Sequence, residues 1–394
     1  MQNDHVQGFG FPTLALLTAV GFAGPVLASV PRLRIPVIVG EFIAGLAIGK
    51  TGFGVVDAAD PTFGLFANIG FALVMFVVGS HVPVRDPAMR SAVPKALARA
   101  VLAGAAAAAL GVGLAAQFGT GHAALYAVLM ASSSAAMTLP MIDSLRLRGP
   151  QVLSLTAQIA IANAAGIVLL PLVIDFHHAA TAALGGLAIT GCAVLLYALL
   201  RWVDRKGWRQ RMHDYSHKNE LALELRINLL VLFGLAVVAV STGVSIMLAG
   251  FALGLVIATV GEPRRLARQL FGITEGFFSP VFFIWLGASL QVRELASQPK
   301  YLLLGAGLGL GGVLAHCVGR LVGQPLSYAV MSSTQLGVAV AAVTIGTQQH
   351  LLAAGEASAL MFGSLLTIAC TSIAGAVAAS RQRAEPDQPA KAAT

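Results

Sequence analysis

Two short clusters of hydroxyl and amide side chains interrupt long apolar stretches of this chain. The first is Ser132–Ser134, followed by Thr138 and Pro140, and the second is Ser332–Gln335. Serine hydroxyls compete for backbone hydrogen bonds and proline removes a backbone donor, so each cluster predicts a break within a helix. Unwound backbone is tolerated inside a membrane only beside protein or water, and the ends of half-helices carry partial charges that bind ions. We therefore predict two discontinuous helices that together form an ion site.

A few ionisable side chains lie within or beside the same apolar stretches. Such residues are candidates for function, because a charge inside a bilayer is costly. Arg320 lies in an apolar segment with His316 four residues before it, on the same helix face. We expect Arg320 to contact the substrate. Glu41, early in another apolar segment, and His316 are the candidates for a proton-linked role.

The composition requires a membrane around these residues. Of 394 residues, 57% are hydrophobic and 11% charged, whereas soluble domains carry about 25% charged residues. A bilayer core is crossed by about 20 helical residues, and on that basis we predict an all-α polytopic membrane protein with about 13 spans. These lie near 9–30, 35–50, 63–82, 92–117, 122–141, 151–176, 179–200, 219–241, 244–261, 276–291, 299–319, 323–348 and 355–379.

Basic residues are distributed unevenly between alternate loops. The net charge of +8 comes from short loops between apolar segments, which is the positive-inside pattern of a membrane protein and not a nucleic-acid surface. One set of loops holds most Lys and Arg residues, whereas the opposite loops hold only Lys50, Arg293 and Lys300. This asymmetry predicts an N-terminus outside the cell and a C-terminus in the cytoplasm.

An internal duplication organises the spans. Residues 42–48 resemble residues 251–257, and residues 79–86 resemble residues 287–294 at almost the same offset; the two polar clusters continue the series. The paired spans are an odd number apart, so the halves should have opposite orientations. Inverted repeats are typical of secondary transporters. We predict a transporter domain at 1–380, with repeats at about 35–200 and 244–379, and a disordered cytoplasmic tail at 381–394.

The chain resembles the monovalent cation:proton antiporter family, which comprises sodium/proton and potassium/proton exchangers. The resembling stretches are 39–45, 66–79, 248–258 and 278–287 in this order and spacing. The resemblance implies a homodimer in a prokaryotic plasma (inner) membrane, with a scaffold domain and a core domain that moves as an elevator. It also implies two helices that are broken in mid-membrane and cross. The family has a basic residue in the helix before the second broken helix, where Arg320 stands.

One departure from the family concerns the acidic residues that exchange a proton for a cation. The family's sixth span carries one or two acids, whereas this chain has Asn163 and Ala164 at those positions, or Gln158 and Ile159 in another register. Asn and Gln coordinate a cation but do not titrate. The predicted ion-binding residues are Ser133, Ser134, Thr138, Gln158, Asn163, Arg320, Thr334 and Gln335.

These observations leave three functions open. The first is exchange of Na⁺ or K⁺ for H⁺, with monovalent cations, protons and the lipid bilayer as partners and no nucleic acid. The second is a carrier of a small anion or organic acid on the same fold, received by Arg320 and helix N-termini. The third is a non-transporting membrane sensor. No motif of an enzyme is present, so we expect no catalytic residue, no cofactor and no metal.

Overall fold

The computed structural model describes residues 9–29, 37–82, 84–85, 87–175, 179–219, 221–261, 264–290 and 298–384. All regular secondary structure in this part of the chain is helical. It includes 11 helices that are long and apolar enough to cross a membrane, and two shorter apolar helices, Val37–Ile48 and Ile246–Val260. Together they match the predicted spans one for one. The predicted all-α polytopic fold is confirmed.

The chain forms two compact units, each assembled from two segments. Unit 1 comprises Met1–Arg85 and Ile167–Pro299, and unit 2 comprises Asp86–Gly166 and Lys300–Thr394. Each unit therefore takes residues from both predicted repeats.

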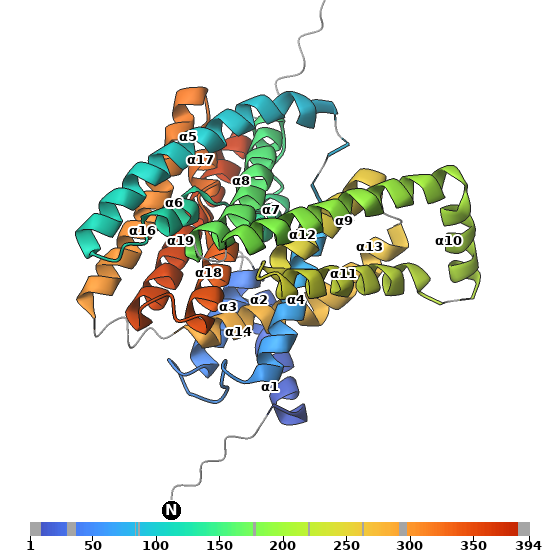
Figure 1. Cartoon of the computed structure of the whole chain (residues 1–394), viewed down its shortest axis with the longest axis horizontal. Helices are drawn as coiled ribbons and strands as arrows, with labels where there is room; N and C mark the ends of the chain where they lie inside the picture. The colour runs from blue at the N-terminus through green and yellow to red at the C-terminus, as the bar shows by residue number, and fades with distance from the viewer. Residues whose placement is uncertain are drawn as a thin grey trace, which may run out of the picture. The chain divides into compact units, whose positions relative to one another are not determined.

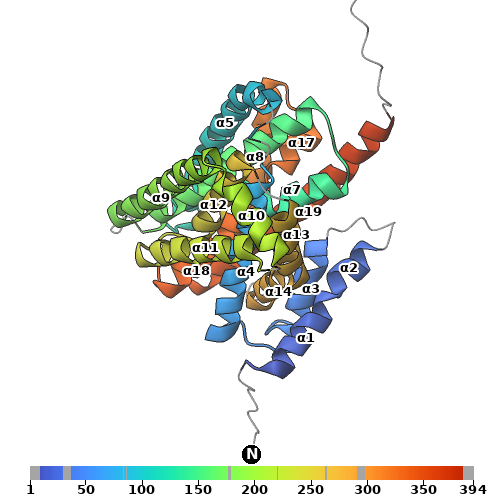
Figure 2. The same cartoon turned by 90° about the vertical axis from the view of Figure 1, so that its right-hand side faces the viewer.

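Unit 1 contains the N-terminal helices and the middle of the chain (Figures 1 and 2). Its helices are α1 (Phe11–Gly21), α2 (Ala23–Ala28), α3 (Val37–Ile48), α4 (Pro61–Ser80), α9 (Ala179–Arg205), α10 (Trp208–Lys218), α11 (Leu223–Ser241), α12 (Ile246–Val260), α13 (Arg264–Ile273) and α14 (Ser279–Ser289), with a π-helical turn, η2 (Thr274–Phe278).

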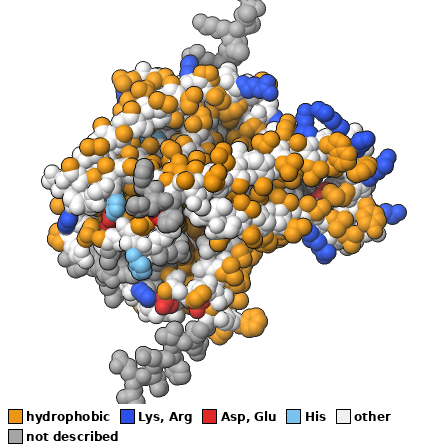
Figure 3. Space-filling view, viewed as in Figure 1, with side chains coloured by type: hydrophobic (Ala, Val, Ile, Leu, Met, Phe, Trp, Pro, Cys, Tyr) orange, Lys and Arg blue, Asp and Glu red, His pale blue; other side chains and the backbone are white. Residues whose placement is uncertain are grey.

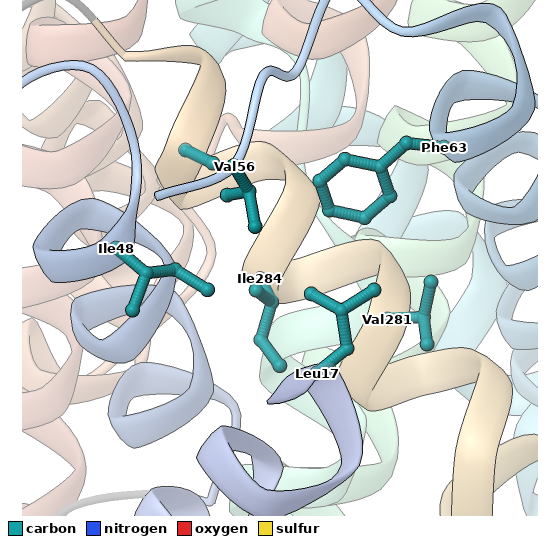
Figure 4. Close-up of a cluster of buried hydrophobic side chains, with 7 residues drawn as sticks. Leu17, Ile48, Val56, Phe63, Val281 and Ile284 are labelled. Atoms are coloured by element: carbon teal, nitrogen blue, oxygen red, sulfur yellow. The ribbon is translucent and has the colours of Figure 1, made fainter. Parts of the chain in front are cut away.

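A cluster of buried aliphatic and aromatic side chains connects α1, α3, α4 and α14 of unit 1. Leu17, Phe63 and Ile284 are at most 1% exposed, and Ile48 and Val281 pack with them (Figure 4). These residues come from segments more than 200 positions apart, so the cluster joins the two segments of the unit. It holds α14 between α1 and α3.

Glycines that correspond in the two repeats lie at corresponding helix crossings in unit 1. A Cβ atom on Gly79 of α4 would lie 2.5 Å from the carbonyl oxygen of Phe251, and one on Gly287 of α14 would lie 2.1 Å from that of Phe42. Gly79 matches Gly287 in the duplication, and Phe42 matches Phe251. Small residues allow helix backbones to approach this closely. The pairing of α3 with α14 and of α12 with α4 supports the predicted inverted repeat.

Asp60 fixes the start of α4, so its removal should destabilise the fold. Its Oδ1 accepts hydrogen bonds from the backbone N–H groups of Thr62 (2.8 Å) and Phe63 (3.1 Å). We expect Asp60→Ala to lower the free energy of unfolding by about 1 kcal/mol, as measured by denaturant unfolding in detergent. The exposed Asp143, which caps no helix N-terminus, provides a control. An equal loss in Asp143→Ala would contradict the capping role.

The surface of unit 1 around α9 and α11 is apolar. Leu187, Leu195 and Leu230 are each about two-thirds exposed, and such a band fits hydrocarbon rather than water. Figure 3 shows Lys and Arg gathered where α9, α10 and α11 meet, with hydrophobic side chains over much of the same face. Basic loops beside an apolar band agree with the positive-inside pattern.

Unit 2 contains both of the predicted broken helices (Figure 1). Its helices are α5 (Pro87–Phe118), α6 (Ala123–Ala131), α7 (Ala135–Ser144), the first part of α8 (Pro150–Ile174), α16 (Pro299–Cys317), the 3₁₀ turn η3 (Val318–Val322), α17 (Leu326–Met331), α18 (Leu336–Gln348) and α19 (Ala354–Ala384). The last helix continues through residues 381–384, which the sequence analysis had assigned to the tail. The rest of the predicted tail lies outside the described residues.

Hydroxyl side chains interrupt the helices as expected. α6 ends at Ala131, Ser132 adopts an extended backbone, and its hydroxyl donates to the carbonyl oxygen of Leu129. In the second break the hydroxyls of Ser332 and Ser333 donate to the carbonyl oxygens of the last turn of α17 (2.8 and 2.7 Å). In a continuous helix these carbonyl oxygens would accept hydrogen bonds from the N–H groups of the following turn. Here the serine hydroxyls bond them instead. Both helices are therefore discontinuous.

Candidate functional site

The two breaks meet inside unit 2. The Ser133 hydroxyl donates to the backbone oxygen of Ser332 at 2.6 Å, and the Thr138 hydroxyl lies 3.3 Å from that of Thr334. All four side chains are at most 1% exposed. Hydroxyl oxygens and non-helical backbone from two segments thus form one buried polar cluster, which we call the crossing site. The predicted residues Ser133, Thr138 and Thr334 lie together there.

The hydroxyl of Ser332 connects the crossing site to two neighbouring helices. It accepts from Nε2 of Gln158 on α8 (3.2 Å), lies 2.9 Å from Nδ1 of His316 on α16, and donates to the carbonyl oxygen of Ala329. Because its own hydrogen is used, Ser332 accepts from His316, which places a hydrogen on Nδ1. The other imidazole nitrogen of His316, Nε2, has no hydrogen-bond partner among the described residues, and the backbone of Met130, Ala131 and Ser132 lies close to the ring.

Gln335 extends the polar cluster on the C-terminal side of the second break. Its backbone N–H donates to the hydroxyl of Thr367 at 3.3 Å, and its side-chain amide lies 3.5 Å from the carbonyl oxygen of Leu308. The hydroxyls of Thr334 and Thr371 are 2.9 Å apart. The hydroxyls of α19 thus hold this break in place, and Gln335 has a structural role as well as its predicted role in binding.

Several polar atoms around the breaks have no hydrogen-bond partner among the described residues. They are both amide atoms of Asn163, the hydroxyl of Ser134 and Nε2 of His316, all on side chains at most 1% exposed. An unpaired buried polar group costs about 1–3 kcal/mol, so such groups normally bind water or an ion. Gly166, three residues after Asn163, packs against Ser132. α8 therefore presents Asn163 beside the break.

No carboxylate belongs to the crossing site. Among the described residues of unit 2, Asp143 is exposed and Glu356 is bonded to His122 and Tyr126. The polar ligands at the breaks are hydroxyl, amide, imidazole and backbone oxygen or nitrogen atoms. Hydroxyl, amide and carbonyl oxygens suit hard monovalent cations. His316 is the one titratable side chain that hydrogen-bonds directly to the breaks in this part of the chain.

Arg320 does not lie at the crossing site, contrary to the sequence-based expectation. It is exposed and belongs to the 3₁₀ turn η3 that follows α16. The basic side chain that α16 does bring to the breaks is His316, which is fully buried. The anion-carrier hypothesis therefore loses the cation on which it depended.

Substitution of Arg320 tests whether His316, and not Arg320, is the basic side chain of the crossing site. We expect Arg320→Ala to change cation-driven proton exchange less than twofold and the free energy of unfolding by no more than about 0.5 kcal/mol, as for other exposed positions. Both quantities are measured on the purified protein. A tenfold loss of exchange would show that Arg320 does take part in ion exchange, contrary to this assignment.

Glu41 belongs to α3 in unit 1. It is 3% exposed, and its Oε2 atom has no hydrogen-bond partner among the described residues. Its side-chain stem is packed against Gly24 of α2. A proton-linked role for Glu41 stays a prediction.

Sequence reasoning missed Arg99, a buried arginine of α5. It is 2% exposed and donates to the hydroxyl of Ser154 (2.9 Å) and to the backbone oxygen of Val322 (3.1 Å). It lies one helical turn after Lys95, and the sequence gives no sign that its side chain is buried. Gln324, also missed, bonds to Gln158 at 2.8 Å and continues the polar chain from Ser332.

Comparisons with known proteins agree with this geometry. The profile of the family described as "Sodium/hydrogen exchanger, transmembrane" matches residues 16–379. Similar curated proteins include the putative Na⁺/H⁺ antiporter YjbQ of Bacillus subtilis, 24% identical over 92% of this chain and 62% of that protein. Another is the glutathione-regulated potassium-efflux system protein KefC of Salmonella typhi, 28% identical over 91% of this chain and 59% of KefC. The chain thus spans less than two-thirds of these relatives.

The fold is similar to that of a solved antiporter. Two structures of the sodium proton antiporter MjNhaP1 from Methanocaldococcus jannaschii superpose with TM-scores of 0.61 and 0.69. They cover 93% and 95% of this chain and 95% and 98% of the other, at 17% and 16% identity. At this identity the likeness concerns the fold alone, and it agrees with the multi-pass helical architecture described above.

Proposed function

The chain belongs to the transmembrane sodium/hydrogen exchanger family, and on this premise we propose that it exchanges sodium or potassium for protons across a membrane. Family membership places it among membrane exchangers rather than enzymes. The observation that carries the proposal is the crossing site itself. Amide and hydroxyl groups without partners among the described residues lie near the breaks, to which one buried imidazole is hydrogen-bonded.

In this proposal His316 replaces the missing family carboxylate as the proton carrier. Its imidazole can take up a proton, which the amides of Asn163 and Gln158 cannot do. An imidazolium next to the breaks repels a monovalent cation, because like charges interact strongly in a low-dielectric site. The neutral imidazole removes that repulsion, and the oxygens of Asn163 and Ser134 bind the cation. Proton and cation therefore compete without a carboxylate.

This competition predicts the charge balance of transport. The crossing site carries one positive charge with the proton and one with the cation, so one-for-one exchange moves no net charge. A single-carboxylate site gives the same balance, because its charge is zero with either a proton or a cation bound. The two sites differ only when they are empty: the crossing site is then neutral, whereas a carboxylate site is negative.

The movement and the cellular setting are also proposals. We infer elevator-type alternating access in which unit 2 carries the ion, since both broken helices and the crossing site belong to unit 2. The apolar surface of α9 and α11 is available for lipid or for a second copy, which fits the expected homodimer. The distribution of basic residues supports a prokaryotic plasma membrane with the N-terminus outside and the C-terminus in the cytoplasm.

Proteoliposomes test the function. The purified protein is reconstituted with a trapped pH dye under an imposed pH gradient, and sodium, potassium, lithium or choline chloride is added in turn. We expect sodium or potassium to dissipate the gradient and choline to have no effect. If no alkali cation does so at any pH from 6 to 9, the exchange function is wrong and the sensor hypothesis gains support.

A further inference from the structure

A second polar cluster lies at the other end of α6 from the crossing site. Glu356 of α19 is the one buried acid among the described residues of unit 2, with 2% of its surface exposed. Its Oε1 atom lies 2.6 Å from Nδ1 of His122 and accepts a 2.6 Å hydrogen bond from the Tyr126 hydroxyl. We call these three residues the Glu356 cluster.

The Glu356 cluster is connected to the crossing site by a short helix. His122 directly precedes α6 and Tyr126 lies in its first turn, and the nine residues of α6 lead directly to the break at Ser132. At 1.5 Å per residue, α6 is about 13 Å long. A group bound at Glu356 is therefore about one half-helix from the breaks, on the side of unit 2 that the charge distribution assigns to the outside.

The neighbours of the cluster bring one further charge. Tyr301 of α16 packs against Gly355, next to Glu356, and the Lys300 ammonium lies 5.8 Å from the Tyr301 ring centroid. Lys300 is exposed to solvent, so its charge is screened. The Thr120 hydroxyl is buried nearby and faces Tyr126. Glu356, His122, Tyr126, Tyr301 and Lys300 are thus the titratable groups on the helices packed around this site.

A buried carboxylate requires a positive partner, and His122 provides one that solvent reaches. Its side chain is 32% exposed, so it exchanges protons with water. The hydrogen bond to Glu356 raises the pKa of His122 above its ordinary value, because the carboxylate stabilises the imidazolium. When His122 loses this proton, the buried carboxylate loses its positive partner, and a bound cation can take that place.

We propose that the Glu356 carboxylate and the Tyr126 hydroxyl form an outer binding site that a monovalent cation and the proton on His122 occupy in turn. Binding of Na⁺ or K⁺ at the carboxylate releases one proton from His122 to water, so charge is conserved. This inference rests on the proposed exchange function, for which it provides a place where arriving cations are concentrated. Glu356 would then be a carboxylate that pairs in turn with the protonated His122 and with a cation, although it does not lie in the sixth span.

Titration of His122 tests the outer site without any measurement of transport. The full-length protein, labelled with ¹³C-histidine, is titrated by NMR in detergent in choline chloride and in sodium or potassium chloride of equal ionic strength. The His122 signal is identified by its loss in His122→Gln. We expect the pKa of His122 to fall by about one unit in the alkali salts, which is a tenfold weaker affinity for the proton.

Two variants distinguish cation binding by the Glu356 cluster from a purely structural contact between α6 and α19. Glu356→Gln should abolish the cation effect and bring the pKa of His122 down in choline as well. Tyr126→Phe keeps the ion pair but removes one cation ligand, so it should reduce the cation effect and leave the pKa in choline raised; it serves alone if Glu356→Gln does not fold. If the pKa of His122 in the parent protein is raised but is the same in choline, sodium and potassium chloride, the proposal is wrong.

The outcomes for the two proposals are separable. If proteoliposomes exchange ions while the titration of His122 ignores alkali cations, the outer site is wrong and the exchange function stands. If His122 responds to sodium or potassium while no cation dissipates the pH gradient, the exchange function is wrong and the outer site stands.

Discussion

Replacing His316 with glutamine is expected to reduce cation-driven proton exchange to the level of protein-free liposomes. Glutamine can keep the hydrogen bond to the Ser332 hydroxyl that Nδ1 makes at 2.9 Å, so the breaks should stay in place. It cannot take up a proton, however, and His316 is the titratable side chain bonded to the breaks. The loss should therefore concern proton coupling and not folding, and it is measured as dye response in proteoliposomes.

The matched control is His81→Gln. His81 is exposed at the end of α4, and its ring bonds the carbonyl oxygen of Val77 in its own helix. Its replacement should leave exchange unchanged. If His316→Gln retains more than half of the parent exchange rate, His316 does not carry the proton, and Glu356 or Glu41 becomes the next candidate.

Replacing Gly254 with valine should prevent stable folding of unit 1. A Cβ atom at this position would lie 2.2 Å from the carbonyl oxygen of Phe76, so α12 and α4 would have to separate. Overpacking of this kind costs about 3 kcal/mol or more. The expected result is a loss of monodisperse protein, or a large fall in thermal midpoint, in size-exclusion measurements of the detergent-solubilised protein.

A second glycine provides a control that restricts this prediction to the crossing of α12 and α4. Gly234 of α11 is exposed with no atom within 4 Å of its Cβ position, so Gly234→Val should behave like the parent protein. By the duplication, Gly45→Val should be as damaging as Gly254→Val, since a Cβ there would lie 2.1 Å from the carbonyl oxygen of Ile284. Equal stability of Gly254→Val and Gly234→Val would contradict the close helix approach.

The membrane fold and the family could be predicted from the sequence because their signals are local or periodic. Each predicted span was a long apolar stretch, and each break was a run of hydroxyl residues whose side chains bond the preceding carbonyls. The family resemblance, which rested on short motifs in a fixed order, is confirmed by a profile match over residues 16–379. The duplication stays a prediction; it rests partly on glycines that lie at close helix crossings.

The identity of the basic residue at the breaks could not be predicted. Arg320 and His316 are four residues apart, which would place them on one face of a continuous α-helix. The structure ends α16 at Cys317 and continues in a 3₁₀ turn over Val318–Val322. A 3₁₀ turn has 3.0 residues per turn instead of 3.6, so it rotates Arg320 relative to His316. Nothing in the apolar sequence signals that change.

Partners from distant segments were likewise beyond sequence reasoning. Glu356 and His122 are 234 residues apart, and Arg99 and Val322 are 223 apart. Each of these side chains taken alone resembles an interfacial residue near a span end. Only the packing of α6 against α5 and of α19 against its neighbours in unit 2 reveals them as buried pairs. The proposed roles of Asn163 and Ser134 stay predictions, supported by their unpaired polar atoms.

Proton release on cation binding tests the central claim most directly. Sodium or potassium chloride is added to the purified protein in weakly buffered detergent solution with a pH indicator, in a Glu356→Gln background that removes the carboxylate of the outer site. The account predicts release of up to one proton for each bound cation, abolished by His316→Gln and preserved by Arg320→Ala. Release that survives His316→Gln, or cation binding without any release at pH values where His316 is protonated, would contradict it.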